Sequence, residues 1–131
     1  MKMKIGYVKE TGIWFSMSAK EKILFSEGVD KIVCDSINEK CNFKQLCEDM
    51  TKGDSLIICG VDDIGTTRNE IEDTWRNITS LGIEIYVVTA PVLFYKENMS
   101  LDESLIRNIT LSMLAHQVEI ANQKLNMIKD L

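Results

Sequence analysis

Proline is almost absent from this sequence, and no long apolar run interrupts it. One proline and seven glycines in 131 residues are too few for a linker-rich or disordered chain. No stretch approaches the ~20 consecutive apolar residues that a membrane-spanning helix needs. The first four residues carry charge, but a strand pattern rather than an apolar signal core follows them. We therefore expect a cytoplasmic protein of one domain that has no contact with a membrane.

Close pairs of metal ligands are also missing. The four cysteines are spaced seven, six and twelve residues apart, and the single histidine, His116, lies far from them. Zinc sites need ligand pairs a few residues apart. We expect free thiols in a reducing compartment, with no bound metal and no cofactor. The thiols are Cys34, Cys41, Cys47 and Cys59.

Positive charge is in deficit. Fifteen lysines and arginines stand against 20 acidic residues, which gives a formal net charge of −5. A domain that holds nucleic acid by itself usually has a basic face, because neutralising phosphates supplies most of its affinity. The composition argues against a dedicated polyanion binder and leaves open a DNA contact through a local patch.

What the sequence does contain is an alternation of strand and helix patterns. Residues 4–9, 30–35, 55–59 and 83–89 are short apolar runs of strand character, and residues 91–94 are consistent with a short edge strand. Helical patterns lie between them, with glycines at their ends. This alternation predicts an α/β fold with a mainly parallel sheet and helices on both faces. The cap-like helix starts are Ser18, Asn42, Thr67 and Ser100.

The rest of the chain is organised around residues 53–70 (GDSLIICGVDDIGTTRNE). Their apolar run suits a strand buried on both faces, followed by a loop with Asp62 and Asp63 and by the helix start at Thr67. Open α/β sheets place ligand sites at such a strand end, next to a helix N-terminus. One alternative for this loop is a flavodoxin-like domain that binds phosphate or Mg²⁺ through the acidic pair.

Residues 100–131 predict one uninterrupted helix that belongs to the same domain as residues 1–99. About thirty residues give a length of roughly 45 Å, whereas a body of ~100 residues is roughly 33 Å across. The helix should therefore overhang its domain. Its apolar side chains recur at intervals of three and four, which is a heptad pattern. We expect its first half to cover the domain and a homodimer to form along the seam Leu111, Leu114, Val118, Ala121, Leu125 and Ile128.

Two stretches resemble the catalytic domain of the serine recombinases, the resolvase and DNA-invertase family. Residues 5–11 (IGYVKET) are similar to that family's opening Ile-Gly-Tyr-x-Arg-Val-Ser. Residues 53–66 (GDSLIICGVDDIGT) are similar to its Gly-Asp-x-Leu-x-Val-x-x-Leu-Asp-Arg-Leu-Gly-Arg, and the terminal helix resembles its dimerisation helix. The resemblance covers nearly the whole chain. It implies a resolvase-like three-layer domain with a role in site-specific DNA recombination.

The resemblance also assigns positions to the chemistry. In that family a serine hydroxyl attacks a DNA phosphodiester, and arginines offset the charge that develops on the phosphoryl oxygens. Thr11 stands at the nucleophile position, and Asp62 stands where the family has an aspartate. The family's arginine positions hold Lys9, a residue at or near Lys40, Asp63 and Thr66, with Arg68 close enough to be a partial substitute.

These substitutions predict that strand cleavage is impaired or lost. At an effective dielectric constant of about 20, a unit charge ~4 Å away contributes about 4 kcal/mol. An acidic Asp63 beside an anionic transition state would therefore oppose the reaction, so the resemblance by itself does not establish an enzyme. The alternative is a catalytically silent dimeric interaction or regulatory module. Its basis is the apolar loop 13–17 (IWFSM), which either packs on the domain or anchors a partner.

Overall fold

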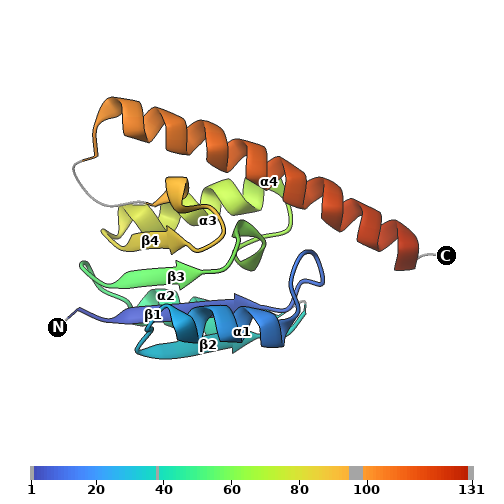
Figure 1. The fold of residues 1–131 in the computed structure, drawn as a ribbon, viewed down its shortest axis with the longest axis horizontal. Helices are drawn as coiled ribbons and strands as arrows, with labels where there is room; N and C mark the ends of the chain where they lie inside the picture. The colour runs from blue at the N-terminus through green and yellow to red at the C-terminus, as the bar shows by residue number, and fades with distance from the viewer. Residues whose placement is uncertain (1, 38, 95–98, 130–131) are drawn as a thin grey trace.

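A computed structural model of the chain describes residues 2–37, 39–94 and 99–129. In these ranges four parallel strands form one sheet in the order β2-β1-β3-β4 (Figure 1). The predicted α/β fold with a parallel sheet is confirmed. The strands are β1 (Lys4–Lys9), β2 (Lys31–Asp35), β3 (Ser55–Ile58) and β4 (Glu84–Val87).

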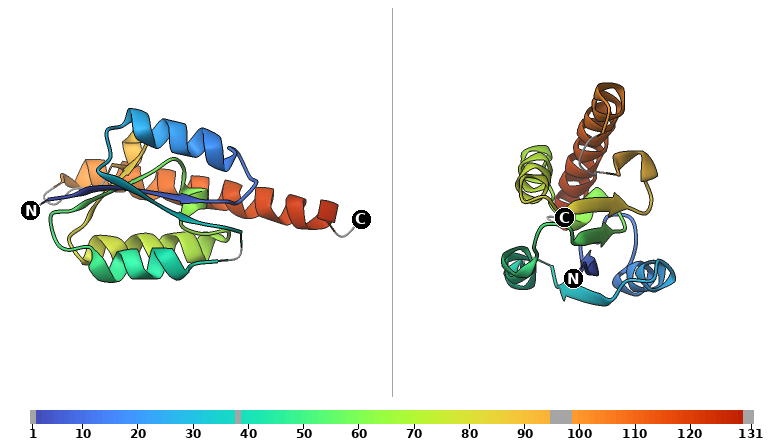
Figure 2. Two further views of the ribbon diagram at one scale, coloured as in Figure 1. Left: turned by 90° about the horizontal axis from the view of Figure 1, so that it is seen from below. Right: turned by 90° about the vertical axis from the view of Figure 1, so that its left-hand side faces the viewer.

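Helices lie on both faces of the sheet (Figure 2). One face is covered by α1, and the other by α2 and α3. The long helix α4 packs against α3 and against the 3-10 turns η1 and η2, and its C-terminal end extends past the sheet as its length predicts (Figure 1). The bounds are α1 (Met17–Ser26), α2 (Cys41–Asp49), η1 (Val61–Asp63), α3 (Arg68–Ser80), η2 (Pro91–Leu93) and α4 (Leu101–Lys129).

The two central strands bury both of their faces. Side chains alternate along a strand, so Ile58 faces the core under α2 and α3 while Ile57 faces the core under α1. Gly6 on β1 allows α1 to come close, because a Cβ atom at this position would lie 3.0 Å from Leu24 Cδ1. The carboxyl ends of β1 and β3 consequently meet α1 and η1 in a tightly packed region.

Two of the four predicted helix starts are confirmed. Thr67 Oγ1 accepts the Glu70 amide at 3.2 Å, and Ser100 Oγ accepts the Glu103 amide at 3.2 Å. Gly82 ends α3 with a positive φ of 79°, a conformation that costs glycine little. Local capping signals are informative here because they involve residues only three positions apart.

The other two starts are wrong, and so is the edge strand. Ser16 rather than Ser18 caps α1, since Ser16 Oγ accepts the Ala19 amide. Asn42 does not cap α2, because Asp35 at the end of β2 accepts the Asn42 amide instead, at 3.1 Å. Residues 91–93 form the turn η2, not a strand. A carboxylate from another element replaced the local cap in α2, which no local pattern indicates.

Two of the six residues of the predicted seam of α4 are buried inside the domain. Leu111 and Val118 are 5% and 0% exposed and belong to the core with Leu93. Ser112 Oγ also donates to Glu72 Oε1 of α3 at 2.7 Å. Leu111 and Val118 cover the domain, as expected for the first half of the helix, and are not available to a second copy, whereas pairing through the rest of the predicted seam stays a prediction. Leu114, Ala121 and Leu125 are half-buried, and Ile128 is exposed. In the described ranges no helix has the length and apolar character to cross a bilayer.

Candidate functional site

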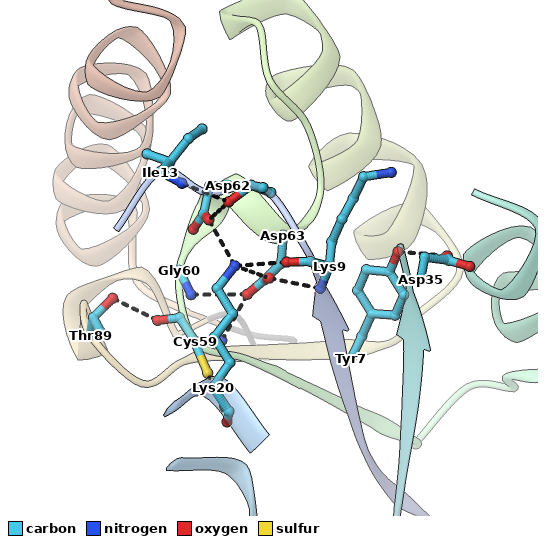
Figure 3. A network of polar contacts seen from close by, with 11 residues as sticks. Tyr7, Lys9, Ile13, Lys20, Asp35, Cys59, Gly60, Asp62, Asp63 and Thr89 are labelled. Atoms are coloured by element: carbon cyan, nitrogen blue, oxygen red, sulfur yellow. Dashed lines mark hydrogen bonds and ion pairs between the residues drawn. The ribbon is translucent and has the colours of Figure 1, made fainter. Parts of the chain in front are cut away.

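A buried lysine occupies the centre of the predicted site. Lys20 lies on α1, one turn before Leu24, on the face that packs against the sheet. Its ammonium contacts Asp62 Oδ2 at 2.9 Å and Asp63 Oδ1 at 2.8 Å, and it donates to the Lys9 carbonyl at 2.9 Å (Figure 3). The Lys20 and Asp63 side chains are both 0% exposed. We refer to Lys20, Asp62 and Asp63 as the buried triad.

Asp63 is fully engaged within the fold. Besides Lys20, its carboxylate accepts the backbone amides of Lys9 at 3.0 Å, Cys59 at 3.2 Å and Gly60 at 3.3 Å. The turn η1 directly after β3 brings the side chain back under these amides. Charged groups survive burial when they are paired and hydrogen-bonded in this way.

Burial and pairing with an opposite charge act in opposite directions on the pKa values of Lys20 and Asp63. Burial works to lower the pKa of Lys20, but Asp63 and Asp62 outweigh it, and the pKa of Lys20 is raised. Burial, and next the neighbouring Asp62, raise the pKa of Asp63 to about 6, although Lys20 opposes this shift. The charged form of Lys20 is therefore stabilised, and its ammonium compensates the negative charge of both carboxylates.

Thr11 is tied to the same triad. Its Oγ1 donates to Asp62 Oδ2 at 2.6 Å and accepts the Ile13 amide at 3.3 Å, and the residue is 7% exposed. A carboxylate at this distance from a hydroxyl is within reach to act as a general base. The same Asp62 oxygen, however, also contacts the Lys20 ammonium, which competes for the electron density that would take up the proton.

The orientation of Asp63 differs from the expectation. From the sequence we expect its charge to lie beside a bound phosphate, but Asp63 is 1% exposed and faces Lys20. The Lys20 ammonium therefore offsets the charge of Asp63 within the fold, and the effect of Asp63 on strand cleavage stays a prediction. The same contacts argue against Mg²⁺ binding by the acidic pair, because both carboxylates already contact the Lys20 ammonium. In the ranges described, no three potential metal ligands cluster.

Most of the predicted site residues lie around one pocket beside the triad. This pocket of about 540 Å³ is lined by Lys9, Thr11, Lys40 and Thr66, among others. Asp62 lies behind Thr11. Arg68 is turned away, with its Nε 3.3 Å from Glu72 Oε1. The fold thus brings the predicted positions together with the exception of Arg68.

No protein-family model and no curated protein matches the sequence. The fold is similar to that of a resolvase family site-specific recombinase from Streptococcus pneumoniae, with a TM-score of 0.59 and 12% identity over 98% of this chain and 95% of that one. The fold is that of a serine recombinase catalytic domain.

Two further solved structures agree with this assignment of the fold. The N-terminal catalytic domain of TP901-1 integrase has a TM-score of 0.57 and 16% identity, over 84% of this chain and 92% of that one. The first ORF in transposon ISC1904 from Sulfolobus solfataricus P2 has a TM-score of 0.51 and 16% identity, over 97% and 99%. The predicted resolvase-like architecture is confirmed, with its parallel sheet and long C-terminal helix.

Sequence reasoning missed two residues of this serine recombinase fold. Lys20 was overlooked because a helical lysine is nearly always solvent-exposed, although its spacing of four from Leu24 places it on the buried face. Asp35 was overlooked because, in the sequence, it is only the last residue of a predicted strand. Its carboxylate accepts the Tyr7 hydroxyl at 2.7 Å and the Phe43 amide at 2.9 Å, which joins β1, β2 and α2.

Proposed function

We propose that this chain is a recombination-related domain in which DNA strand cleavage is impaired or lost. The observation that supports this most directly is the contact of Thr11 Oγ1 with Asp62, whose accepting oxygen is shared with Lys20. A nucleophilic hydroxyl has to reach a phosphorus atom and pass its proton to a base. In this chain the hydroxyl is nearly buried, and its base is paired with a cation.

The cations of the pocket also support the proposal. Lys9 and Lys40 line it, but a lysine ammonium is a point charge without the bidentate fork that arginine offers a phosphoryl group. Lys40 is further engaged by Glu70 Oε2 at 2.6 Å. Removing one well-placed donor from a site of this kind costs roughly 10²–10³ in rate. The pocket retains positive charge without the geometry that phosphoryl transfer requires.

The test is a search for a covalent protein–DNA adduct. We expect the wild-type chain, incubated with supercoiled plasmid and then denatured, to run free of DNA on a gel and to leave the plasmid uncut. The Thr11→Ala variant should be indistinguishable from it. An adduct that forms with the wild type and disappears in Thr11→Ala would show that cleavage survives and would overturn the proposal.

We infer that the domain pairs with a second copy through a different face of α4 from the one predicted. Five large apolar side chains, each at least 38% exposed, share this face with the exposed His116 and Gln123. Together these positions recur at intervals of three and four over three heptads, which is the pattern of a two-helix interface. We call the set the outer seam: Ile106, Ile109, Met113, His116, Ile120, Gln123 and Met127.

An exposed charge in the outer seam should separate the copies. We expect the wild-type chain to sediment as a dimer and Ile109→Lys to sediment as a monomer, because a lysine at a buried interface position loses its hydration. Asn108→Lys is the matched control, since Asn108 is exposed on the same helix but outside the seam. A wild-type monomer at all concentrations in analytical ultracentrifugation would refute the pairing.

A second candidate function is a catalytically silent interaction module. Its support is that Trp14 and Phe15 are 43% and 41% exposed, while Ile13 and Met17 of the same loop pack against the domain. Half of the apolar loop is thus available to a partner. Both candidates share the outer seam and predict no cleavage. They differ in whether the chain takes part in DNA recombination.

A further inference from the structure

The sheet face that carries α1 is only partly covered by that helix. α1 packs against β1, whereas η2 packs against β4 at the edge of the sheet (Figure 2). A pocket of about 300 Å³ lies on this face, and the first residues of β1, β3 and β4 line it. It is therefore at the opposite end of the strands from the buried triad. We call it the edge pocket; its polar and aromatic lining residues are Lys4, Glu27, Ser55, Glu84, Tyr86 and Phe94.

The strand register arranges the floor of the edge pocket in two rows. Lys4, Ser55 and Glu84 are direct neighbours across β1, β3 and β4, and they form a polar row. Two residues further along the strands, on the same face, Ile57 lies beside Tyr86. The floor thus places an apolar surface next to a polar one, which is the usual make-up of a small-molecule site.

Two aromatic rings border the apolar row. The ring centroids of Tyr86 and Phe94 lie 6.0 Å apart, with the ring planes inclined by 70°, and both residues are half-buried. Two rings in this arrangement enclose a corner. The face of an aromatic ring attracts a cation that comes within about 6 Å of its centroid. The corner is therefore suited to a positively charged group.

The charges of the edge pocket favour the same kind of ligand. Glu84 accepts the Ser55 hydroxyl at 3.3 Å, and Glu27 is a second acidic residue of the lining. Within the described part of the chain, neither carboxylate forms an ion pair. Lys4 Nζ donates to the backbone carbonyl of Glu27 at 2.7 Å instead. Two acidic residues against one lysine leave an excess of negative charge, which a bound cation would offset.

We propose that the edge pocket binds an alkylammonium group, with the cation between Glu84 and the two rings and with the alkyl chain over Ile57. The carboxylate would accept a charge-assisted hydrogen bond from the ammonium, and the rings would replace part of its hydration. A volume of about 300 Å³ is at the lower limit of ligand sites and suits a small ligand. A free amine or the side chain of a lysine on another protein would supply the group. This inference goes beyond the proposed function and does not depend on it.

The test is a two-dimensional amide NMR titration of the wild-type chain at constant ionic strength. The probes are n-butylammonium, its uncharged analogue n-butanol, and an end-capped tetrapeptide that contains one lysine. We expect n-butylammonium to shift the amides of Ser55, Glu84, Tyr86 and Phe94 and to leave that of Asp63 unchanged. The alcohol should bind about tenfold more weakly, because it lacks the charge-assisted contact. Tighter binding of the peptide than of n-butylammonium would identify a lysine side chain as the source, and weaker binding a free amine.

Three variants make the test specific. Glu84→Gln keeps an oxygen that can accept the Ser55 hydroxyl but removes the charge, and it should weaken n-butylammonium binding about tenfold. Glu48→Gln is the matched control, since Glu48 is exposed on α2 at the other face of the sheet, and it should leave binding unchanged. Phe94→Leu keeps an apolar side chain without the ring and should weaken binding about threefold.

The contrary outcomes are equally well defined. Equal affinities for n-butylammonium and n-butanol, unshifted amides in the edge pocket, or equal losses in Glu84→Gln and Glu48→Gln would each overturn the proposal. If Glu84→Gln does not fold, Phe94→Leu and the comparison of the amine with the alcohol decide the matter.

Discussion

At the scale of single residues, Lys20 determines whether two carboxylates can be buried together. Its ammonium is the cation that contacts both Asp62 and Asp63, and the side chain is 0% exposed. Removing one partner of a buried ion pair is far more damaging than replacing the whole group by apolar side chains. The triad is therefore a point where a single substitution has a large and specific effect.

We expect Lys20→Met to lower the free energy of unfolding by about 3–5 kcal/mol, because it leaves two adjacent buried carboxylates without their cation. Urea denaturation followed by circular dichroism would measure the loss. Lys22→Met, two residues along the same helix and exposed, is the control and should change stability by less than about 0.5 kcal/mol. A similar loss of unfolding free energy in both variants would mean that the contacts of Lys20 with Asp62 and Asp63 do not stabilise the fold.

The same variant should show a characteristic dependence on pH. Burial and Asp62 already raise the pKa of Asp63 to about 6 with Lys20 present, and without the ammonium the pKa rises further. A folded state that binds protons more tightly than the unfolded state becomes less stable as pH rises. The deficit of Lys20→Met should thus be smallest near pH ~4 and grow toward pH ~8. Unfolding curves whose offset from the wild type is constant across this range would contradict the pairing.

At the scale of elements, α4 has two apolar sides with different roles. Leu111, Ala115 and Val118 pack into the core, while the outer seam faces away from the domain. Apolar side chains recur at heptad spacing in two sets along this helix, the predicted seam and the outer seam, which lie on different faces. Periodicity alone does not tell which of them faces the sheet, since both satisfy the same spacing.

The two sides should respond differently to truncation. Leu111→Ala should lower the free energy of unfolding by about 2–5 kcal/mol because it opens a cavity in the core. Met127→Ala, at a position 69% exposed, should leave the stability of the isolated monomer unchanged and affect only pairing. Thermal unfolding of both variants at low protein concentration checks this. A large loss from Met127→Ala under these conditions would show that the outer seam packs within one copy.

At the scale of the whole molecule, the order of strands and helices could be predicted from the sequence because each element depends on a local pattern. The strand at residues 55–58 and the Thr67 cap follow from neighbours within a few positions. The site was harder to predict. Thr11, Lys9 and Lys40 line one pocket, yet the direction of Asp63 depends on Lys20, which lies 43 positions away in the sequence. Contacts over such separations have no signature in a single sequence.

The backbone of Lys9 supplies a carbonyl to Lys20 and an amide to Asp63, so the triad also reports on how β1 is aligned with β3. A slip of one residue between these strands would turn every side chain of β1 to the opposite face. It would also strip three charged groups of their partners at once. Misaligned pairings of the sheet are thereby made costly, and the chain has a built-in preference for one alignment during folding.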